Sequence, residues 1–167
     1  MAGRDERRPT DREGIVRSAS EIERVELGPN AVAFALTGGD TDGRFSLTDF
    51  TMAGPPAPPP PPHVHDDADE CVYLIEGSLH VGVGDDVRAV GPGSVVLVPR
   101  GTLHSLENPG PTAARFVVVL SPPGFEGFWQ AMARLRAELD GPPDPETVLR
   151  LQHQFHMSTG GAARRFD

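Results

Sequence analysis

Four residues in the middle of the chain are of types that bind metal ions. His63 and His65 are one residue apart, Glu70 follows five positions later, and His104 comes on a separate segment. Side chains alternate along an extended strand, so His63 and His65 project to the same side. Three imidazoles and one carboxylate suit iron, nickel, cobalt, manganese or zinc better than calcium or magnesium, which favour oxygen ligands. The pattern therefore predicts a site for one divalent transition metal.

Each of these residues also has a structural interpretation, because any single histidine is more often packed or exposed than ligating. For the set, that interpretation is weak, since histidines buried together without an ion would leave unsatisfied polar atoms at about 1–3 kcal/mol each. Asp66, Asp67 and Asp69 are alternatives to Glu70, but the spacing favours Glu70 and a solvated acidic loop for the aspartates. Four further residues are expected to pack in the core or lie at the surface: Cys71, His80, His153 and His156.

The composition indicates one domain built mainly of strands. The chain has 167 residues, including 19 Gly and 18 Pro, an excess that favours short strands joined by tight turns. Its net charge of −9 opposes nucleic acid as a partner. No segment is apolar enough to span a bilayer, and the charged N-terminus does not resemble a signal peptide. The single cysteine fits a reducing compartment, so we expect a cytoplasmic protein.

Alternating apolar residues and turn signals predict an all-β domain followed by two helices. Strands are expected at 22–27, 31–36, 45–52, 71–75, 79–83, 87–90, 95–98, 103–107 and 113–120, and helices at 124–139 and from 145 to about 157. The organisation is then a disordered arm (1–18), a barrel (20–122), C-terminal helices packed on it (123–157) and a flexible tail (158–167). The proline-rich run 54–62 is interpreted as a stiff connector that positions His63, or alternatively as a ligand for a proline-recognition domain.

Two motifs in this chain resemble the paired signature of the cupin superfamily. The second is complete, and the first departs only at its leading glycine, where Ala57 stands. The matching residues are His63, His65, Glu70 and Gly77, then Gly93, Pro99, Gly101, His104 and Asn108. The resemblance implies a small antiparallel β-barrel of the jelly-roll type, a metal held by His63, His65, Glu70 and His104, and a homodimer. Residues 116–129 look like single-domain bacterial cupins of the quercetin-dioxygenase-like group.

The leading functional hypothesis is a metal-dependent oxygenase acting on a hydroxylated, cyclic or phenolic small molecule. A metal ion lowers the pKa of a bound hydroxyl group, and Glu70 would accept its proton. One alternative is a non-oxidative isomerase, cyclase or lyase that uses the ion only as a Lewis acid. Another is a module that binds a small molecule without catalysis. A fold of this kind supports several chemistries on one ligand set, so the sequence leaves all three open.

Overall fold

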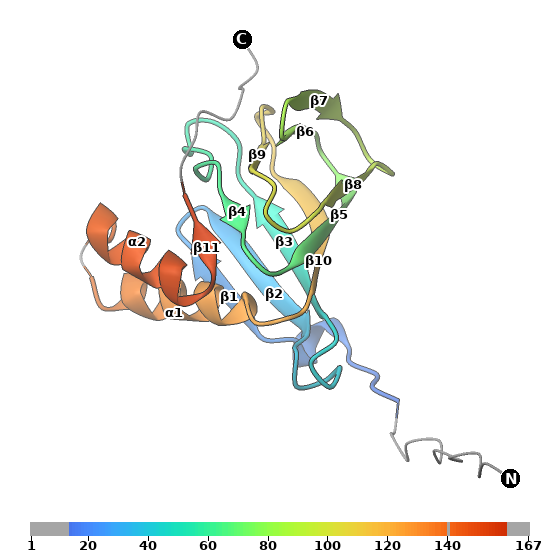
Figure 1. Ribbon diagram of the computed structural model, residues 1–167, viewed down its shortest axis with the longest axis vertical. Helices are drawn as coiled ribbons and strands as arrows, with labels where there is room; N and C mark the ends of the chain where they lie inside the picture. Colours follow the sequence, from blue (N-terminus) through green and yellow to red (C-terminus); the bar gives the residue numbers. More distant parts are fainter. Residues whose placement is uncertain (1–13, 140, 160–167) are drawn as a thin grey trace, which may run out of the picture.

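The computed structural model describes residues 14–139 and 141–159, and its strands form a jelly-roll barrel with two helices on one side (Figure 1). This architecture confirms the predicted fold class. The strands are β1 (Arg24–Leu27), β2 (Asn30–Leu36), β3 (Ser46–Met52), β4 (Val64–His65), β5 (Asp69–Glu76), β6 (Leu79–Val83), β7 (Asp86–Val90), β8 (Val95–Val98), β9 (His104–Glu107), β10 (Ala114–Ser121) and β11 (Met157–Ser158). The helices are the short 3-10 helix η1 (Ala19–Glu21), α1 (Glu126–Ala137) and α2 (Pro145–Gln154).

Two antiparallel sheets make up the barrel. The larger has six strands in the order β1-β2-β3-β10-β5-β8, and the smaller has the order β7-β6-β9. A two-stranded pair, β11-β4, extends the wall of the smaller sheet, because His63 forms a bridge to His104 at the start of β9. The chain thus crosses repeatedly between the walls, and residues far apart in sequence meet inside.

Alternation along the strands builds the core between these walls. In β3 and β10 every second residue is buried, including Phe50, Phe116 and Val118. Phe50 and Phe116 stack with their ring centroids 5.4 Å apart. Gly77, the last residue of the first motif, adopts φ +82° at the turn into β6, and a Cβ there would lie 2.8 Å from Ala114 Cα. A glycine is required at this position by both the dihedral and the close approach.

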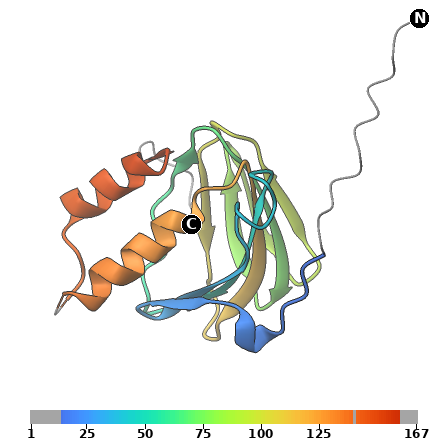
Figure 2. The ribbon, with the colours of Figure 1, turned by 90° about the horizontal axis from the view of Figure 1, so that it is seen from below.

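The two helices lie side by side against one flank of the barrel (Figure 2). Helix α1 begins within the predicted segment and buries Phe128 and Met132. The second helix was predicted to run to about residue 157, but α2 ends at Gln154. His156 adopts φ +54°, which reverses the chain, and Met157 then pairs with His65 in β4. The prediction was wrong because apolar residues at 155 and 157 fit a helical stripe as well as a return strand.

The two ends of the chain fall largely outside the described residues. The predicted arm lies there over residues 1–13 and the predicted tail over residues 160–167. Arg17, which the sequence placed in the arm, forms a two-pronged ion pair with Asp40 at 2.6 and 2.8 Å. Ser158, placed in the tail, pairs with Val64 and donates a hydrogen bond to Asp66. The folded part therefore extends beyond the predicted domain limits at both ends.

Within the described part of the chain, none of the helices combines the length and the apolar character needed to cross a membrane.

Candidate metal centre

The four residues singled out from the sequence meet inside the barrel. His65 lies on β4, Glu70 on β5 and His104 at the start of β9, and His63 immediately precedes β4. One potential ligand atom from each residue lies within 4.8 Å of the others. Only 5% of His65, 4% of Glu70 and 1% of His104 is exposed, while His63 is half-buried. The chain has thus assembled a buried group of donors that could hold a metal ion.

Backbone hydrogen bonds hold the two motifs against each other. His63 and His104 exchange N–H···O bonds of 3.0 and 2.9 Å, and the amide of Gly101 donates to the carbonyl of His65 at 2.8 Å. Glu70 reaches the same space from the larger sheet, where β5 lies between β10 and β8. The arrangement explains why two stretches of sequence about forty residues apart must both be present for one site.

Main-chain carbonyls fix the orientation of two imidazoles. The Nδ1 atom of His63 lies 3.1 Å from the carbonyl oxygen of Pro61, and Nδ1 of His104 lies 3.0 Å from that of Thr102. A carbonyl only accepts, so each Nδ1 carries the proton and donates it, which leaves the Nε2 lone pair free to bind a cation. These two carbonyls could not be identified from the sequence, because backbone atoms leave no residue-type signal.

The carboxylate of Glu70 faces two imidazole nitrogens with no hydrogen bond between them. Its Oε2 atom lies 3.1 Å from His65 Nε2 and 3.0 Å from His104 Nε2. Glu70 Oε2 and His104 Nε2 are nonetheless buried without a hydrogen-bond partner. With Nδ1 of His104 protonated, both atoms present lone pairs, so they require a shared cation, either a proton or a metal ion. The residues present therefore fit a divalent ion.

The electrostatics of the cluster favour the ligating protonation states of His63 and Glu70. Burial lowers the pKa of His63 to about 4, and the nearby imidazole of His104 adds to the effect. Burial alone would raise the pKa of Glu70, but the close imidazoles of His104 and His65 outweigh it and lower that pKa. Burial would likewise lower the pKa of His104, and the Glu70 carboxylate reverses this and raises it. A neutral His63 and an ionised Glu70 are the forms that bind metal.

The donor group opens into an apolar, aromatic pocket inside the barrel. We call it the inner pocket; it is lined by Thr48, Phe50, Met52, Pro60, His63, His65, Glu70, Leu106, Phe116, Val118, Leu120, Phe125, Glu126 and Trp129. The edge of His65 meets the ring of Phe125 at a centroid distance of 4.6 Å. The inner pocket therefore places apolar and aromatic walls beside three of the donors, His63, His65 and Glu70.

A second space, the outer cavity, continues from the inner pocket towards the helices. The two share Phe50, Met52, Pro60, His63 and Trp129. The outer cavity is lined in addition by α1, α2, β11 and the prolines of the connector. Phe125 and Phe128, which follow β10, are buried in the core; Phe125 also lines the inner pocket and Phe128 the outer cavity.

The aspartates near Glu70 contact other groups instead. Asp69 accepts hydrogen bonds from the side chain and backbone of Arg100, which lower its pKa to about 2. Asp66 accepts from Ser158, and Asp67 lies 3.7 Å from His156. Among these four carboxylates, Glu70 is the one grouped with the three histidines.

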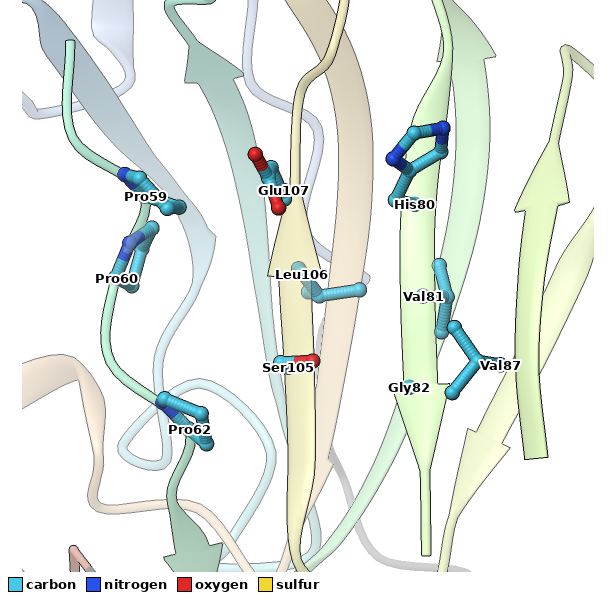
Figure 3. A pocket seen from close by; sticks show the side chains of 10 residues that line it. All are labelled: Pro59, Pro60, Pro62, His80, Val81, Gly82, Val87, Ser105, Leu106 and Glu107. Carbon is cyan, nitrogen blue, oxygen red and sulfur yellow. The ribbon is translucent and has the colours of Figure 1, made fainter. Parts of the chain in front are cut away.

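His80 also lies away from the donor group. It sits on β6 opposite Glu107 of β9, in a groove that the connector borders (Figure 3). Figure 3 places Pro59, Pro60 and Pro62 beside β9. The proline-rich run therefore lies along the smaller sheet, and His63 follows directly after it.

Comparison with known proteins places this architecture in a family. Residues 50–120 match the cupin domain model. Together with the jelly-roll fold, this match identifies the central part of the chain as a cupin domain. The match does not distinguish the quercetin-dioxygenase-like group from other cupins.

Particular relatives show partial similarity. The tetracenomycin polyketide synthase protein TcmJ of Streptomyces glaucescens is 44% identical over 61 residues, which are 36% of this chain and 40% of that protein. The polyketide cyclase RemF of Streptomyces resistomycificus is 24% identical with a TM-score of 0.53, over 65% of this chain and 80% of that one. An RmlC-like cupin of Shewanella frigidimarina is 15% identical with a TM-score of 0.58, over 69% of this chain and 96% of that one. This chain matches only about two fifths of the length of TcmJ, and the two structures show the fold alone.

Proposed function

We propose that this protein is a metal-dependent enzyme that activates a hydroxylated, cyclic small molecule of the aromatic polyketide type. The observation that carries the proposal is the buried lone-pair contact between Glu70 Oε2 and His104 Nε2 at the floor of an aromatic pocket. His63, His65, Glu70 and His104 would hold one iron, nickel, cobalt or manganese ion, with zinc as a further possibility.

The lining of the inner pocket supports the substrate class. Aromatic rings from both the barrel and α1 surround the donors, among them Phe50, Phe116, Phe125 and Trp129. Such walls suit a flat ring system by stacking and by excluding water. The similarity to TcmJ, whose printed name places it with a polyketide synthase, favours the same class of molecule.

The proposed chemistry is proton removal from a phenol or an enolisable ketone. A bound divalent ion would act as a Lewis acid that lowers the pKa of the substrate oxygen or of the carbon beside a carbonyl. Glu70 would receive the proton, because its carboxylate is held ionised and faces the inner pocket. The apolar walls exclude water, so the resulting anion is shielded from protonation by solvent. A stabilised enolate of this kind is the intermediate that a cyclisation or isomerisation requires.

Oxygenation is the second candidate. His63, His65, Glu70 and His104 would hold the ion, and a redox-active ion such as iron would supply the chemistry for reaction of the substrate with dioxygen. The similarity to TcmJ and the donor set do not themselves require an oxidant, so we place cyclisation or isomerisation first.

Hydrogen exchange tests the proposed reaction without knowledge of the natural substrate. The probe is a tetralone that carries a hydroxyl group beside its ketone. In D₂O, protein loaded with each metal is expected to speed deuterium uptake beside the ketone at least about 100-fold over metal-free protein, with or without oxygen. Mass spectrometry of the probe gives the rate, and an oxygen electrode runs in parallel. Consumption of the probe that requires oxygen would favour the oxygenase. Binding without exchange or consumption would leave a non-catalytic module.

We also propose a cytoplasmic homodimer with no nucleic-acid partner. The net charge of −9 opposes phosphate binding, and the lone Cys71 fits a reducing compartment. The outer face of the larger sheet supports self-association, because exposed apolar side chains gather at the edge strand β8 and its neighbour β5. They are Tyr73, Val95 and Leu97, at 46%, 64% and 63% exposure. An apolar patch on an open sheet edge favours contact with a second copy.

Replacement of both exposed residues of β8 by charge tests this dimer. Val95→Glu/Leu97→Glu is expected to convert a dimer to a monomer, because burying two unpaired carboxylates in the contact is unfavourable. Sedimentation velocity measures the mass in solution. A control variant, Arg150→Glu on helix α2 on the other side of the barrel, should leave the dimer intact. A wild-type monomer, or a dimer that survives the double substitution, would refute this interface.

A further inference from the structure

We propose that the outer cavity holds a carboxylate-binding subsite formed by Arg136 and Gln152, so that the substrate is an aromatic carboxylic acid. This inference rests on the proposed function, which gives the substrate a ring system. It adds a carboxylate at the end of the substrate that lies away from the metal site.

Arg136 occupies a position on α1 that the helical pattern reserves for apolar residues. It follows Phe128 and Met132 at steps of four, so all three lie on one face. That face borders the outer cavity, which all three residues line. Arg134, two residues earlier, is exposed and does not line the cavity. Arg136 is half-buried with its Nε atom fully enclosed, so its charge lies beside the outer cavity.

The guanidinium of Arg136 makes no hydrogen bond or ion pair with the described residues. Its Nε atom is buried and unpartnered. Its Nη1 atom lies against the turn between β1 and β2, 3.1 Å from where a Cβ at Gly28 would stand. Among the described residues that line the outer cavity there is no Asp or Glu. An arginine remains charged under all ordinary conditions, so an anion that enters the outer cavity would meet an unpaired guanidinium.

Gln152 on α2 adds a second unpartnered polar group to the same space. Only 5% of the residue is exposed, its side chain makes no hydrogen bond with the described residues, and it lines the outer cavity. The carboxamide atoms of Gln152 keep some accessible surface, so a ligand or a water molecule in the outer cavity can form hydrogen bonds with them. The remaining walls are largely apolar, including Leu27, Met132, Val148 and Met157.

The donor pattern selects a planar monoanion. A guanidinium binds a carboxylate through two parallel N–H···O bonds, and a carboxamide N–H₂ can add a third. One arginine supplies one positive charge, which a carboxylate neutralises and a phosphate would exceed. His63 and Trp129 line both spaces, so one elongated molecule can reach the donors of the metal site and Arg136 together.

Fluorescence of the single tryptophan, Trp129, provides the readout. The probes are a hydroxynaphthoic acid with its hydroxyl and carboxyl groups at opposite ends of the ring system, and its methyl ester. Metal-free wild-type protein is expected to bind the acid at least about tenfold more tightly than the ester. Arg136→Gln should abolish that preference, because it weakens the binding of the acid and leaves the binding of the ester unchanged. Gln152→Leu should reduce the preference about threefold. Arg134→Gln is the matched control on the same helix and should match the wild type.

The preference for the acid over the ester is measured on metal-free protein, so its result does not depend on whether the proposed reaction occurs. An acid and an ester that bind the wild type equally would overturn the subsite, as would a full preference in Arg136→Gln. If Arg136→Gln fails to fold, Arg136→Lys takes its place; it keeps the charge but loses the paired donors. A preference undiminished in both Arg136→Lys and Gln152→Leu would then overturn it.

Discussion

Glu70→Gln is expected to lower the rate of metal-dependent hydrogen exchange by at least about 100-fold while most of the metal is retained. General-base catalysis contributes about 10²–10⁴-fold, and an amide cannot accept the proton. The amide oxygen can still coordinate, and His63, His65 and His104 remain. Loss of turnover with the ion in place separates the role of Glu70 as a base from its role as a ligand.

The measurement pairs exchange rate with metal content for each preparation. Asp69→Asn is the matched control: it removes the neighbouring carboxylate, which pairs with Arg100 at the surface and does not face the donors. This control should exchange at close to the wild-type rate. A Glu70→Gln protein that holds the metal and exchanges at the wild-type rate would remove Glu70 as the base.

Gly54→Ala is expected to destabilise the fold by about 3 kcal/mol, at the upper end of the usual cost of overpacking. A Cβ at Gly54 would lie only 1.7 Å from the carbonyl oxygen of Gly110, so two backbone segments would have to separate. The contact is fixed by Asn108, whose side-chain amide donates to the carbonyls of Met52 and Thr112 at 2.9 and 2.8 Å. The motif asparagine thus joins the end of β3 to the turn before β10.

Thermal denaturation followed by circular dichroism measures the effect. For a domain of this size the midpoint should fall by about 6–12 °C. Gly91→Ala is the control, since Gly91 has an ordinary φ and a Cβ there would meet nothing within 4 Å. Equal midpoints for the Gly54 and Gly91 variants would show that the close approach of Gly54 to Gly110 is not a constraint in solution.

The barrel was predictable from the sequence because its strands obey the simplest periodicity. Burial alternates along β3 and β10, but the residue types follow it only in part, since Ser46 and Thr48 are buried in β3 while Leu47 is half-buried. The four donor residues were also predictable as a group, since their types and spacing suffice. What brings them together is the bridge between His63 and His104, which the sequence implies only through the pairing of the two motifs.

Other features depend on contacts that residue types do not encode. The carbonyls of Pro61 and Thr102 orient two imidazoles, and any residue could supply them. Strand β11 is too short to show a period and was absorbed into the predicted helix. Arg136 carried a usable signal, because it interrupts the apolar stripe of α1 at a step of four. The proposed role of Arg136 in binding a carboxylate depends on the structure, where no described residue that lines the outer cavity is acidic.

The most direct test of the account is the metal content of protein purified without a histidine tag, measured by mass spectrometry of the elements. The wild type is expected to carry close to one iron, nickel, cobalt, manganese or zinc ion per chain. The His63→Ala/His104→Ala variant should carry less than about a tenth of that, because two of the four ligands are gone. A wild type that binds no transition metal under any loading condition would contradict the account and leave a small-molecule-binding module.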